Sequence, residues 1–276
     1  MTDLASSPPP VVMTLGGNDP SGGAGLAADI TTIVSLGCHP TPVVTALTVQ
    51  DTHNVHALLP VEPAQLLAQA RAVLDDMPVA AIKIGLIGSA ENAGALHTLL
   101  AAYPDIPVVL DPILAAGGGT ELASPKLLDT LRTLLLPLVT ILTPNSVEAR
   151  RLAPEADTLE ACAMALLEHG CRYVLITGGH EPTGEVINTC HGNNRLLESY
   201  RWARLPGHHH GSGCTLAAAI AALLAQGQEL EWAAFSSVVR RAQDYTWHAL
   251  QASHRIGGGQ LLPNRLFWAN IHRGAA

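Results

Sequence analysis

Lysine is scarce in this chain of 276 residues, with Lys83 and Lys126 as the only two. Lysine and arginine together number 15, against 23 aspartates and glutamates, which gives a formal net charge of −8 at pH 7. Proteins that bind the phosphate backbone of nucleic acids need clustered basic side chains. We therefore expect no nucleic-acid partner.

Long apolar runs are also missing. The longest, Leu216–Ala225, is far shorter than the roughly 20 residues that span a bilayer, and residues 1–10 lack the basic and apolar regions of a secretory signal. The cysteines are odd in number and form no Cys-x-x-Cys pair, which is typical of reduced thiols: Cys38, Cys162, Cys171, Cys190 and Cys214. These absences predict a cytoplasmic protein with no membrane partner and with residues 1–10 flexible.

The chain instead alternates two kinds of segment. Short β-branched runs predict strands at 11–17, 42–49, 79–85, 107–111, 139–142 and 173–177. Longer segments rich in Ala and Leu predict helices at 24–36, 63–76, 91–102, 125–134 and 159–168. This alternation predicts an α/β fold with a mostly parallel sheet and helices on both faces. Because no linker interrupts it, we expect a single domain over residues 1–276.

The pattern changes in the last third of the chain. Segments 185–192 and 195–203 are short, alternate in polarity and are joined by two asparagines, which predicts a β-hairpin as a small antiparallel extension of the sheet. Further helices are expected at 212–226, at 230–252 and near 263–272. The glycines at 257–259 predict a flexible break before the last of them.

The first predicted strand ends in a glycine-rich stretch, GNDPSGGAG, at Gly17–Gly25. Ligands of open parallel sheets bind beyond the carboxyl ends of the strands, so this stretch is a candidate phosphate loop. It lacks the Lys-Ser/Thr pair of a Walker A loop and the glycine spacing of a dinucleotide site. Two interpretations stay open: a tight turn that lets the next helix pack closely, or a pocket in which Asp19 and Asp29 bind an uncharged substrate.

A better candidate for an anion site lies much later, in the segment HGSGCTL. Gly211, Ser212, Gly213 and Cys214 directly precede a long apolar helix. Their backbone N–H groups can converge on a phosphate at the helix N-terminus, where the helix dipole adds about half a positive charge. The glycines allow the backbone to approach the phosphate closely.

Six segments together have the order and spacing of one enzyme family: GNDPSGGAGLAADI, VTALTVQDT, KIGLIGS, VVLDP, LTPNSVEA and HGSGCTL. In these segments the chain resembles the hydroxymethylpyrimidine/phosphomethylpyrimidine kinases of thiamin biosynthesis. The resemblance implies a ribokinase-like three-layer fold. It also implies phosphorylation of 4-amino-5-hydroxymethyl-2-methylpyrimidine and then of its monophosphate, with ATP and Mg²⁺ as cofactors. A small aminopyrimidine is the implied partner, and a homodimer the implied assembly.

The resemblance also implies a set of site residues. The substrate-binding residues are implied to be Gly17, Asp29, Thr48, Gln50 and Leu86. The ATP-binding residues are implied to be Asn145, Thr177, Gly179 and His210. Metal binding is implied for Asp111 and Glu148, a pair that suits Mg²⁺ because this ion keeps several waters and bridges phosphates. Without the resemblance, both acids also fit roles at helix N-termini, as a cap or a partner of the dipole.

The implied catalytic residue is Cys214, with Gly211, Ser212 and Gly213 stabilising charge on the transferred phosphoryl group. An ordinary cysteine has a pKa of about 8.5, and a helix N-terminus lowers that value. We therefore expect Cys214 to accept the proton of the substrate hydroxyl. The alternative is a small buried residue that begins a helix.

Three departures from the family bear on the second phosphorylation. Thr177 stands where the family has a lysine that touches phosphates, the loop GGGTEL at 117–122 lacks an aspartate, and PGHHH precedes the anion loop. His210 matches the family histidine, whereas His208 and His209 have no assigned role. Losing the lysine places the second step at risk, since a substrate phosphate must then lie beside the incoming one. An arginine from elsewhere in the chain can compensate.

Two other functions stay open. The first is a pyridoxine or pyridoxal kinase, which performs a single phosphorylation and often carries threonine at the position of Thr177. The second is a non-catalytic pyrimidine-binding protein in which the phosphate side has decayed.

Overall fold

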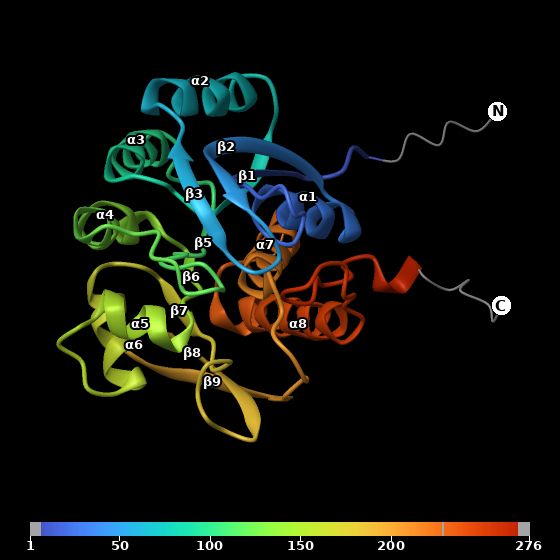
Figure 1. The fold of residues 1–276 in the computed structure, drawn as a ribbon. Coiled ribbons are helices and arrows are strands. Elements are labelled where there is room, and N and C mark those ends of the chain that lie inside the picture. The colour runs from blue at the N-terminus through green and yellow to red at the C-terminus, as the bar shows by residue number, and fades with distance from the viewer. Residues whose placement is uncertain (1–6, 228, 270–276) are drawn as a thin grey trace, which may run out of the picture.

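The computed structural model describes residues 7–227 and 229–269 and is built on one nine-stranded sheet (Figure 1). Its strands are β1 (Val11–Asn18), β2 (His39–Gln50), β3 (Val55–Pro60), β4 (Val79–Ile84), β5 (Val108–Leu110), β6 (Ile141–Leu142), β7 (Tyr173–Ile176), β8 (Glu185–Gly192) and β9 (Arg195–Ala203). Their order is β3-β2-β1-β4-β5-β6-β7-β8-β9. In this order, the six adjacent strands β2, β1, β4, β5, β6 and β7 pair in parallel. Strands β3, β8 and β9 are antiparallel to their neighbours. The predicted parallel sheet and antiparallel hairpin are confirmed.

The helices form a layer on each face of the sheet. They are α1 (Gly25–Ser35), α2 (Pro63–Leu74), α3 (Ala90–Ala101), α4 (Pro125–Thr130), α5 (Ser146–Leu152), α6 (Leu159–Glu168), α7 (Ser212–Ala225) and α8 (Trp232–Gln251). Short π and 3-10 turns follow at Leu131–Leu135, Leu136–Leu138 and Phe267–Ala269. Helices α1, α7 and α8 pack on one face and α2 to α6 on the other (Figure 1). The predicted three-layer α/β architecture is confirmed.

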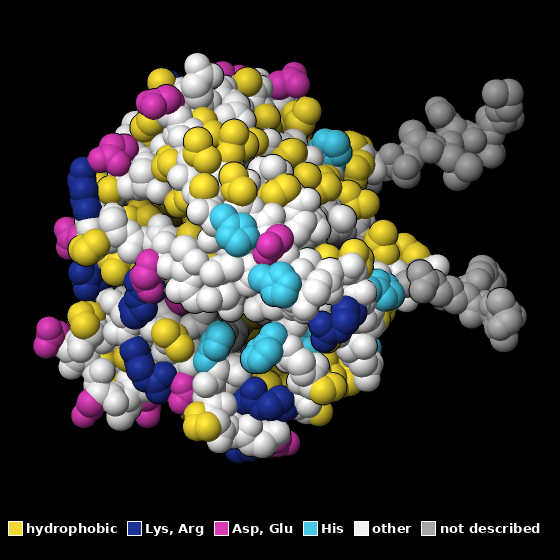
Figure 2. Space-filling model, in the orientation of Figure 1, with side chains coloured by type: hydrophobic (Ala, Val, Ile, Leu, Met, Phe, Trp, Pro, Cys, Tyr) yellow, Lys and Arg dark blue, Asp and Glu magenta, His cyan; other side chains and the backbone are white. Residues whose placement is uncertain are grey.

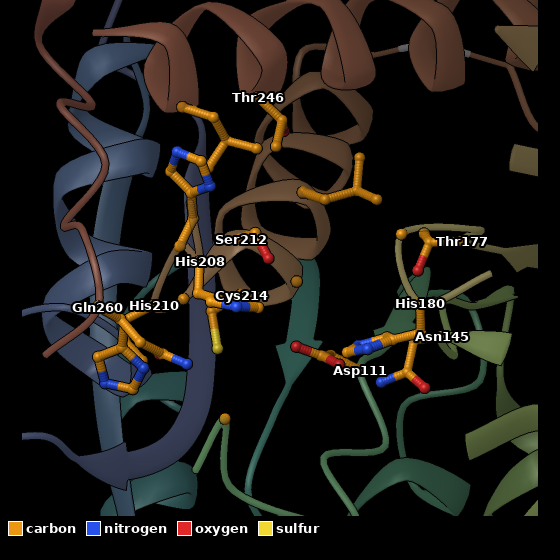
Figure 3. A pocket seen from close by; sticks show the side chains of 18 of the residues that line it. Asp111, Asn145, Thr177, His180, His208, His210, Ser212, Cys214, Thr246 and Gln260 are labelled. Carbon is orange, nitrogen blue, oxygen red and sulfur yellow. The ribbon is translucent and has the colours of Figure 1, made fainter. Parts of the chain in front are cut away.

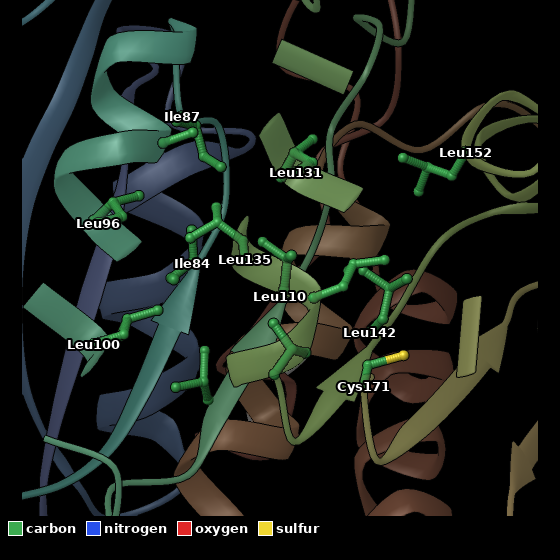
Figure 4. Packing of buried hydrophobic residues seen from close by; sticks show 14 of the residues in the cluster. Ile84, Ile87, Leu96, Leu100, Leu110, Leu131, Leu135, Leu142, Leu152 and Cys171 are labelled. Carbon is green, nitrogen blue, oxygen red and sulfur yellow. The ribbon is translucent and has the colours of Figure 1, made fainter. Parts of the chain in front are cut away.

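Apolar side chains from the strands fill the space under each helical layer. On the face of α3 and α4, Ile84, Leu110 and Leu142 of three adjacent strands contact Leu96 and Leu135 (Figure 4). On the other face, α7 is buried over nearly its whole length, because its run of Ala and Leu lies between the sheet and α8. Burial on both faces explains why the central strands read as continuous apolar runs rather than alternating ones.

Several elements differ from the sequence predictions. Strand β3 was not predicted: it is an edge strand whose short apolar sequence, VHALLP, shows no strict alternation and leaves most of its side chains exposed. Helix α5 is only seven residues long, too short for helical periodicity to be visible. The helix expected at 125–134 ends at Thr130 and continues as a π turn.

Three of the sequence predictions concern segments near the chain ends. The glycines at 257–259, expected to be a flexible break, pack against the turn between β2 and β3, where Gly259 N donates to Thr52 Oγ1 at 3.0 Å. The last predicted helix is a 3-10 turn as far as the described residues extend, and residues 270–272 lie outside them. The prediction that residues 1–10 are flexible concerns mostly residues 1–6, which also lie outside the described part.

The order of the strands places the ligand site. Strand β1 pairs with β2 on one side and with β4 on the other. The connection from β1 to β2 through α1 covers one face of the sheet, and the connection from β4 to β5 through α3 covers the opposite face. Such a reversal opens a crevice beyond the carboxyl ends of the parallel strands. The glycine-rich stretch after β1 borders this crevice.

Candidate active site

A cavity of about 1170 Å³ opens at the carboxyl ends of the central strands. Its walls come from the segments after β1, β2, β4, β5, β6 and β7 and from the start of α7. Asp111, Asn145 and Thr177 line one side and Cys214 and Ser212 the other (Figure 3). Because pockets for single small molecules measure about 300–1000 Å³, this cavity has room for more than one ligand.

The loop from Gly211 to Cys214 forms the N-terminus of α7, as predicted from the sequence. Gly211 is the N-cap residue and has a φ of +78°, a conformation that favours glycine. A side chain there would also collide with the chain, because a Cβ would lie 2.1 Å from Gly23 O. The first N–H groups of α7 have no partner within the helix, and Ser212, Gly213 and Cys214 line the cavity. This geometry suits a bound phosphate oxygen.

Asp19 organises the glycine-rich loop that follows β1. Its carboxylate accepts hydrogen bonds from Ser21 N at 2.8 Å and Ala24 N at 2.7 Å, and lies 3.0 Å from His210 Nε2. Burial opposes its ionisation, but hydrogen bonds from His210 and Gln50 hold the pKa of Asp19 well below its usual range. Through His210, Asp19 ties this loop to the segment before α7.

Asp29, predicted to bind the substrate ring, does not line the cavity. It is fully buried in α1, and Lys83 Nζ lies 2.9 Å from both of its carboxylate oxygens. Thr14 donates to the same carboxylate at 2.5 Å. The sequence prediction for Asp29 is therefore wrong in its placement, since this acid is the counter-ion of a lysine inside the sheet. Of Asp19 and Asp29, only Asp19 borders the cavity.

Asp111 and Glu148 lie together below the anion loop. Asp111 directly follows β5, and Glu148 is in the first turn of α5. Burial raises the pKa of Asp111, against the attraction of Lys83, and the charge of Glu148 raises it further. Burial likewise raises the pKa of Glu148, against hydrogen bonds from Asn145 N and Leu114 N. Two buried acids with raised pKa values favour a cation between them.

Glu148 also has the helix-terminal role that the sequence left open. It forms a capping box with Asn145, in which Glu148 Oε2 accepts from Asn145 N at 3.0 Å and Asn145 Oδ1 accepts from Glu148 N at 2.9 Å. Glu148 Oε1 accepts from Leu114 N at 3.1 Å. Both of its carboxylate oxygens are thus engaged, so Glu148 suits contact with a metal ion through water, and Asp111 suits direct contact. Within residues 7–227 and 229–269, no cluster of three or more potential metal ligands occurs.

The thiol of Cys214 is less acidic than the sequence analysis expected. Burial raises its pKa to about 12, against the attraction of Lys83. The helix N-terminus does not outweigh burial, so the predicted lowering of this pKa is wrong for the unliganded protein.

One arginine that the sequence did not single out shapes the side of the cavity near Thr177. Arg204 follows β9 and donates to Gly179 O at 2.8 Å, Glu181 O at 2.8 Å and Thr183 O at 3.0 Å. Its three hydrogen bonds fix the loop after β7, next to Thr177. No sequence motif marks this arginine, because its partners are backbone carbonyls.

All the other predicted site residues line this one cavity: Gly17, Thr48, Gln50, Leu86, Asp111, Asn145, Glu148, Thr177, Gly179, His210, Gly211, Ser212, Gly213 and Cys214. They come from segments far apart in the chain. Figure 2 shows histidine side chains gathered at the middle of the face that carries the cavity's loops. His208 and His209 belong to the lining as well.

The site combines an anion loop at a helix N-terminus, a pair of buried acids and a glycine-rich loop. These features define the class of small-molecule phosphotransferases with a three-layer α/β fold. Comparisons with known proteins narrow the class further.

A family model described as phosphomethylpyrimidine kinase matches residues 19–264. The chain is 39% identical over 261 residues to the hydroxymethylpyrimidine/phosphomethylpyrimidine kinase of Streptomyces coelicolor, covering 91% of this chain and 92% of that protein. Phosphomethylpyrimidine kinase from Clostridium difficile 630 aligns with a TM-score of 0.74 at 30% identity, covering 87% of this chain and 99% of that one. The chain therefore belongs to the phosphomethylpyrimidine kinase family.

A second solved structure shows how widely this fold is shared. Pyridoxal kinase of Bacillus subtilis, in complex with ADP, aligns with a TM-score of 0.83 at 25% identity, covering 94% of this chain and 98% of that one. Both alignments extend over most of the chain, and the predicted ribokinase-like fold is confirmed. Among the described residues, no helix is both long and apolar enough to cross a membrane.

Proposed function

We propose that this protein uses ATP and Mg²⁺ to phosphorylate 4-amino-5-hydroxymethyl-2-methylpyrimidine and then its monophosphate, as a step of thiamin biosynthesis. The observation that carries the proposal is that one cavity joins the glycine-rich loop and Gln50 to the anion loop at Gly211–Cys214 and the acids Asp111 and Glu148. Membership of the phosphomethylpyrimidine kinase family supports this assignment.

The pyrimidine lies, in this proposal, against the wall that Gly17 and Leu86 form. A Cβ on Gly17 would lie 2.7 Å from Leu86 Cδ2, so the glycine lets Leu86 pack directly on the end of β1 and gives the cavity an apolar wall that suits a flat ring. Thr48 donates to Asn18 O at 2.7 Å and fixes that wall. Gln50, which lines the cavity with Asp19, offers an amide to the ring nitrogens and the exocyclic amine.

The nucleotide occupies the other end of the cavity. Asn145, Thr177 and Gly179 lie there on adjoining segments, and Asn145 pairs with Thr177 as an isolated bridge. Asp111 would hold Mg²⁺ directly and Glu148 through water. When bound, the ion supplies positive charge that offsets the charge of the phosphates. The backbone N–H groups of the anion loop then orient the phosphoryl group for transfer.

Cys214 is the residue that we propose takes the proton from the substrate hydroxyl. Burial keeps the thiol protonated, so it first releases its proton to solvent in the cavity, and the attraction of Lys83 stabilises the thiolate that forms. The thiolate then accepts the proton of the hydroxyl. The hydroxyl oxygen then forms the new bond to phosphorus, and ADP leaves.

Replacing Cys214 with Ala tests this proton route. We expect kcat to fall by roughly 10²- to 10⁴-fold, the usual contribution of a general base, with KM for ATP little changed. Steady-state kinetics measures both constants. Full activity of the Cys214→Ala protein would remove the thiol from the mechanism.

Pyridoxal is the second candidate substrate. The fold similarity to a pyridoxal kinase and the uncharged Thr177 favour it. Comparing kcat/KM for the pyrimidine alcohol and for pyridoxal, both with Mg-ATP, decides between the two. We expect the pyrimidine to be the better substrate. Turnover of pyridoxal alone would overturn the assignment, and pyrimidine binding without ATP turnover would indicate a non-catalytic binding protein.

We further propose a cytoplasmic homodimer. All five cysteines are free, which fits a reducing compartment.

The outer face of β2 and β3 is the proposed dimer interface. It exposes Leu47, Val49 and Leu59, each more than half accessible, with Leu47 and Leu59 directly paired. Hydrophobic side chains gather over these strands in Figure 2. Light scattering on the protein and on its Leu59→Glu variant tests whether this face joins two subunits, since the charge would give a monomer.

A further inference from the structure

Arg265 is a buried cation without an acidic partner among the described residues. It lies after α8 with 6% of its surface exposed. Its Nε donates to Thr215 Oγ1 at 2.9 Å and its Nη2 to Gly23 O at 2.5 Å, and neither acceptor carries a charge. A guanidinium stays protonated in proteins, and a buried charge without an ion pair is costly. Asp29 and Asp19 attract this charge only from beyond ion-pair distance. Packing alone therefore does not account for a cation at this position.

The guanidinium lies directly behind the anion loop. A Cβ built on Gly211 would lie 2.9 Å from Arg265 Nη2, so the cation touches the backbone of the residue that caps α7. Gly211 also lines the cavity. Only the thickness of this backbone separates the charge from the cavity, and Thr215, its hydrogen-bond partner, belongs to the first turn of the same helix.

The backbone of Arg265 is fixed from two helices. Its carbonyl oxygen accepts a hydrogen bond from Ser35 Oγ at 2.7 Å and another from Tyr245 Oη at 2.6 Å. Ser35 ends α1, and Tyr245 lies in α8. The cation is thus held at both its backbone and its head group, so its charge acts at a defined place.

We infer that Arg265 is a positioning residue whose charge supports the binding of a phosphorylated substrate at the anion loop. This inference rests on the proposed function and explains how the second phosphorylation proceeds although Thr177 brings no charge to the cavity. The first substrate is an uncharged alcohol, whereas the second is a phosphate dianion that lies beside the phosphates of ATP. A positive charge behind the loop therefore stabilises the second complex far more than the first.

The test compares wild-type protein with Arg265→Gln and Arg265→Lys. Calorimetry measures the affinity for the pyrimidine alcohol and for its monophosphate, and kinetics measures both phosphorylations with Mg-ATP. For Arg265→Gln we expect a loss of about tenfold or more in affinity and kcat/KM for the monophosphate, and less than about threefold for the alcohol. Arg265→Lys keeps the charge, so we expect it to restore most of the affinity and kcat/KM for the monophosphate.

Controls separate charge from structural support. Tyr245→Phe removes a hydrogen bond to the Arg265 carbonyl but keeps the charge. We expect it to lower thermal stability without changing the ratio of kcat/KM for the monophosphate to kcat/KM for the alcohol. If Arg265→Gln does not fold, Arg265→Met provides the uncharged protein, because its unbranched side chain refills the site without burying an amide.

Equal losses for both substrates in the uncharged variant would overturn the inference and leave Arg265 as a purely structural tie. Unchanged affinity for the monophosphate in a folded uncharged variant would overturn it too. Failure of the proposed function gives a different result, because the wild-type protein then phosphorylates neither pyrimidine.

Discussion

At the scale of single residues, the two lysines of the chain have opposite environments. Lys83 is fully buried in β4 and pairs with the fully buried Asp29. Lys126 pairs with Glu91 on the surface, where both side chains are more than half exposed. We expect Lys83→Met to lower the free energy of unfolding by about 3–5 kcal/mol, because it leaves a buried carboxylate without a cation. Urea denaturation measures this loss.

Lys126→Met is the matched control for that experiment. An exposed ion pair contributes about 0–1 kcal/mol, so this variant should unfold at nearly the wild-type urea concentration. Equal stability of the two variants would show that the Lys83–Asp29 pair is not the structural element described above.

His191 is expected to make stability depend on pH. Both of its ring nitrogens are buried without a hydrogen-bond partner among the described residues, and burial lowers its pKa below the ordinary value of 6.5. The unfolded chain therefore takes up this proton first as the pH falls. The stability that neutral His191 allows is complete above pH 6.5 and is lost progressively below it.

Replacing His191 with Leu should flatten this dependence. Urea denaturation between pH 7.5 and about pH 5 measures the slope for wild type, His191→Leu and the exposed control His39→Gln. We expect the control to keep the wild-type slope and His191→Leu to lose part of it. Parallel curves for all three proteins would contradict this role for His191.

At the scale of elements, helix α7 has a glycine in a left-handed conformation at each end. Gly211 has a φ of +78° and Gly227 a φ of +86°. A Cβ would lie 2.1 Å from Gly23 O at the first, whereas at the second no atom of the described residues beyond the chain neighbours lies within 4 Å. Alanine at either position costs about 1 kcal/mol or more in backbone strain. Only Gly211→Ala also displaces the anion loop.

We therefore expect different effects on catalysis. Gly211→Ala should reduce kcat/KM on the order of a hundredfold, as displacements near reacting groups do, and Gly227→Ala should leave it near the wild-type value. Kinetics and thermal denaturation of both variants check this. An equal loss of activity in the two would mean that strain in α7, rather than the position of its first turn, controls the activity.

Sequence patterns predicted most strands and helices, but they missed β3 and α5. The hairpin strands β8 and β9 have the predicted bounds, because their alternation and the asparagine turn are local signals. Strand β3 depends on pairing with β2 at the sheet edge, and α5 depends on a capping box at Asn145. Periodicity does not reveal such features, since pairing and capping, rather than a repeating apolar face, determine them.

At the scale of the whole molecule, the cavity could be predicted because the topology brings the ends of parallel strands together. Charge interactions through the core could not be predicted. Asp29 pairs with Lys83, 54 positions away, and therefore lies outside the cavity lining. Burial of Cys214 raises a pKa that its helix position alone would lower. Arg265 approaches Gly23 from the opposite end of the chain, without any motif.

In the function proposed above, one cavity supports two successive phosphoryl transfers to the same pyrimidine. Phosphorus NMR of the wild-type protein with Mg-ATP and the pyrimidine alcohol follows both steps in one sample. We predict that the monophosphate signal rises first and is then replaced by the two coupled signals of a diphosphate, with two ADP formed per pyrimidine. A sample in which neither pyrimidine product forms, while ATP stays intact, would contradict the account.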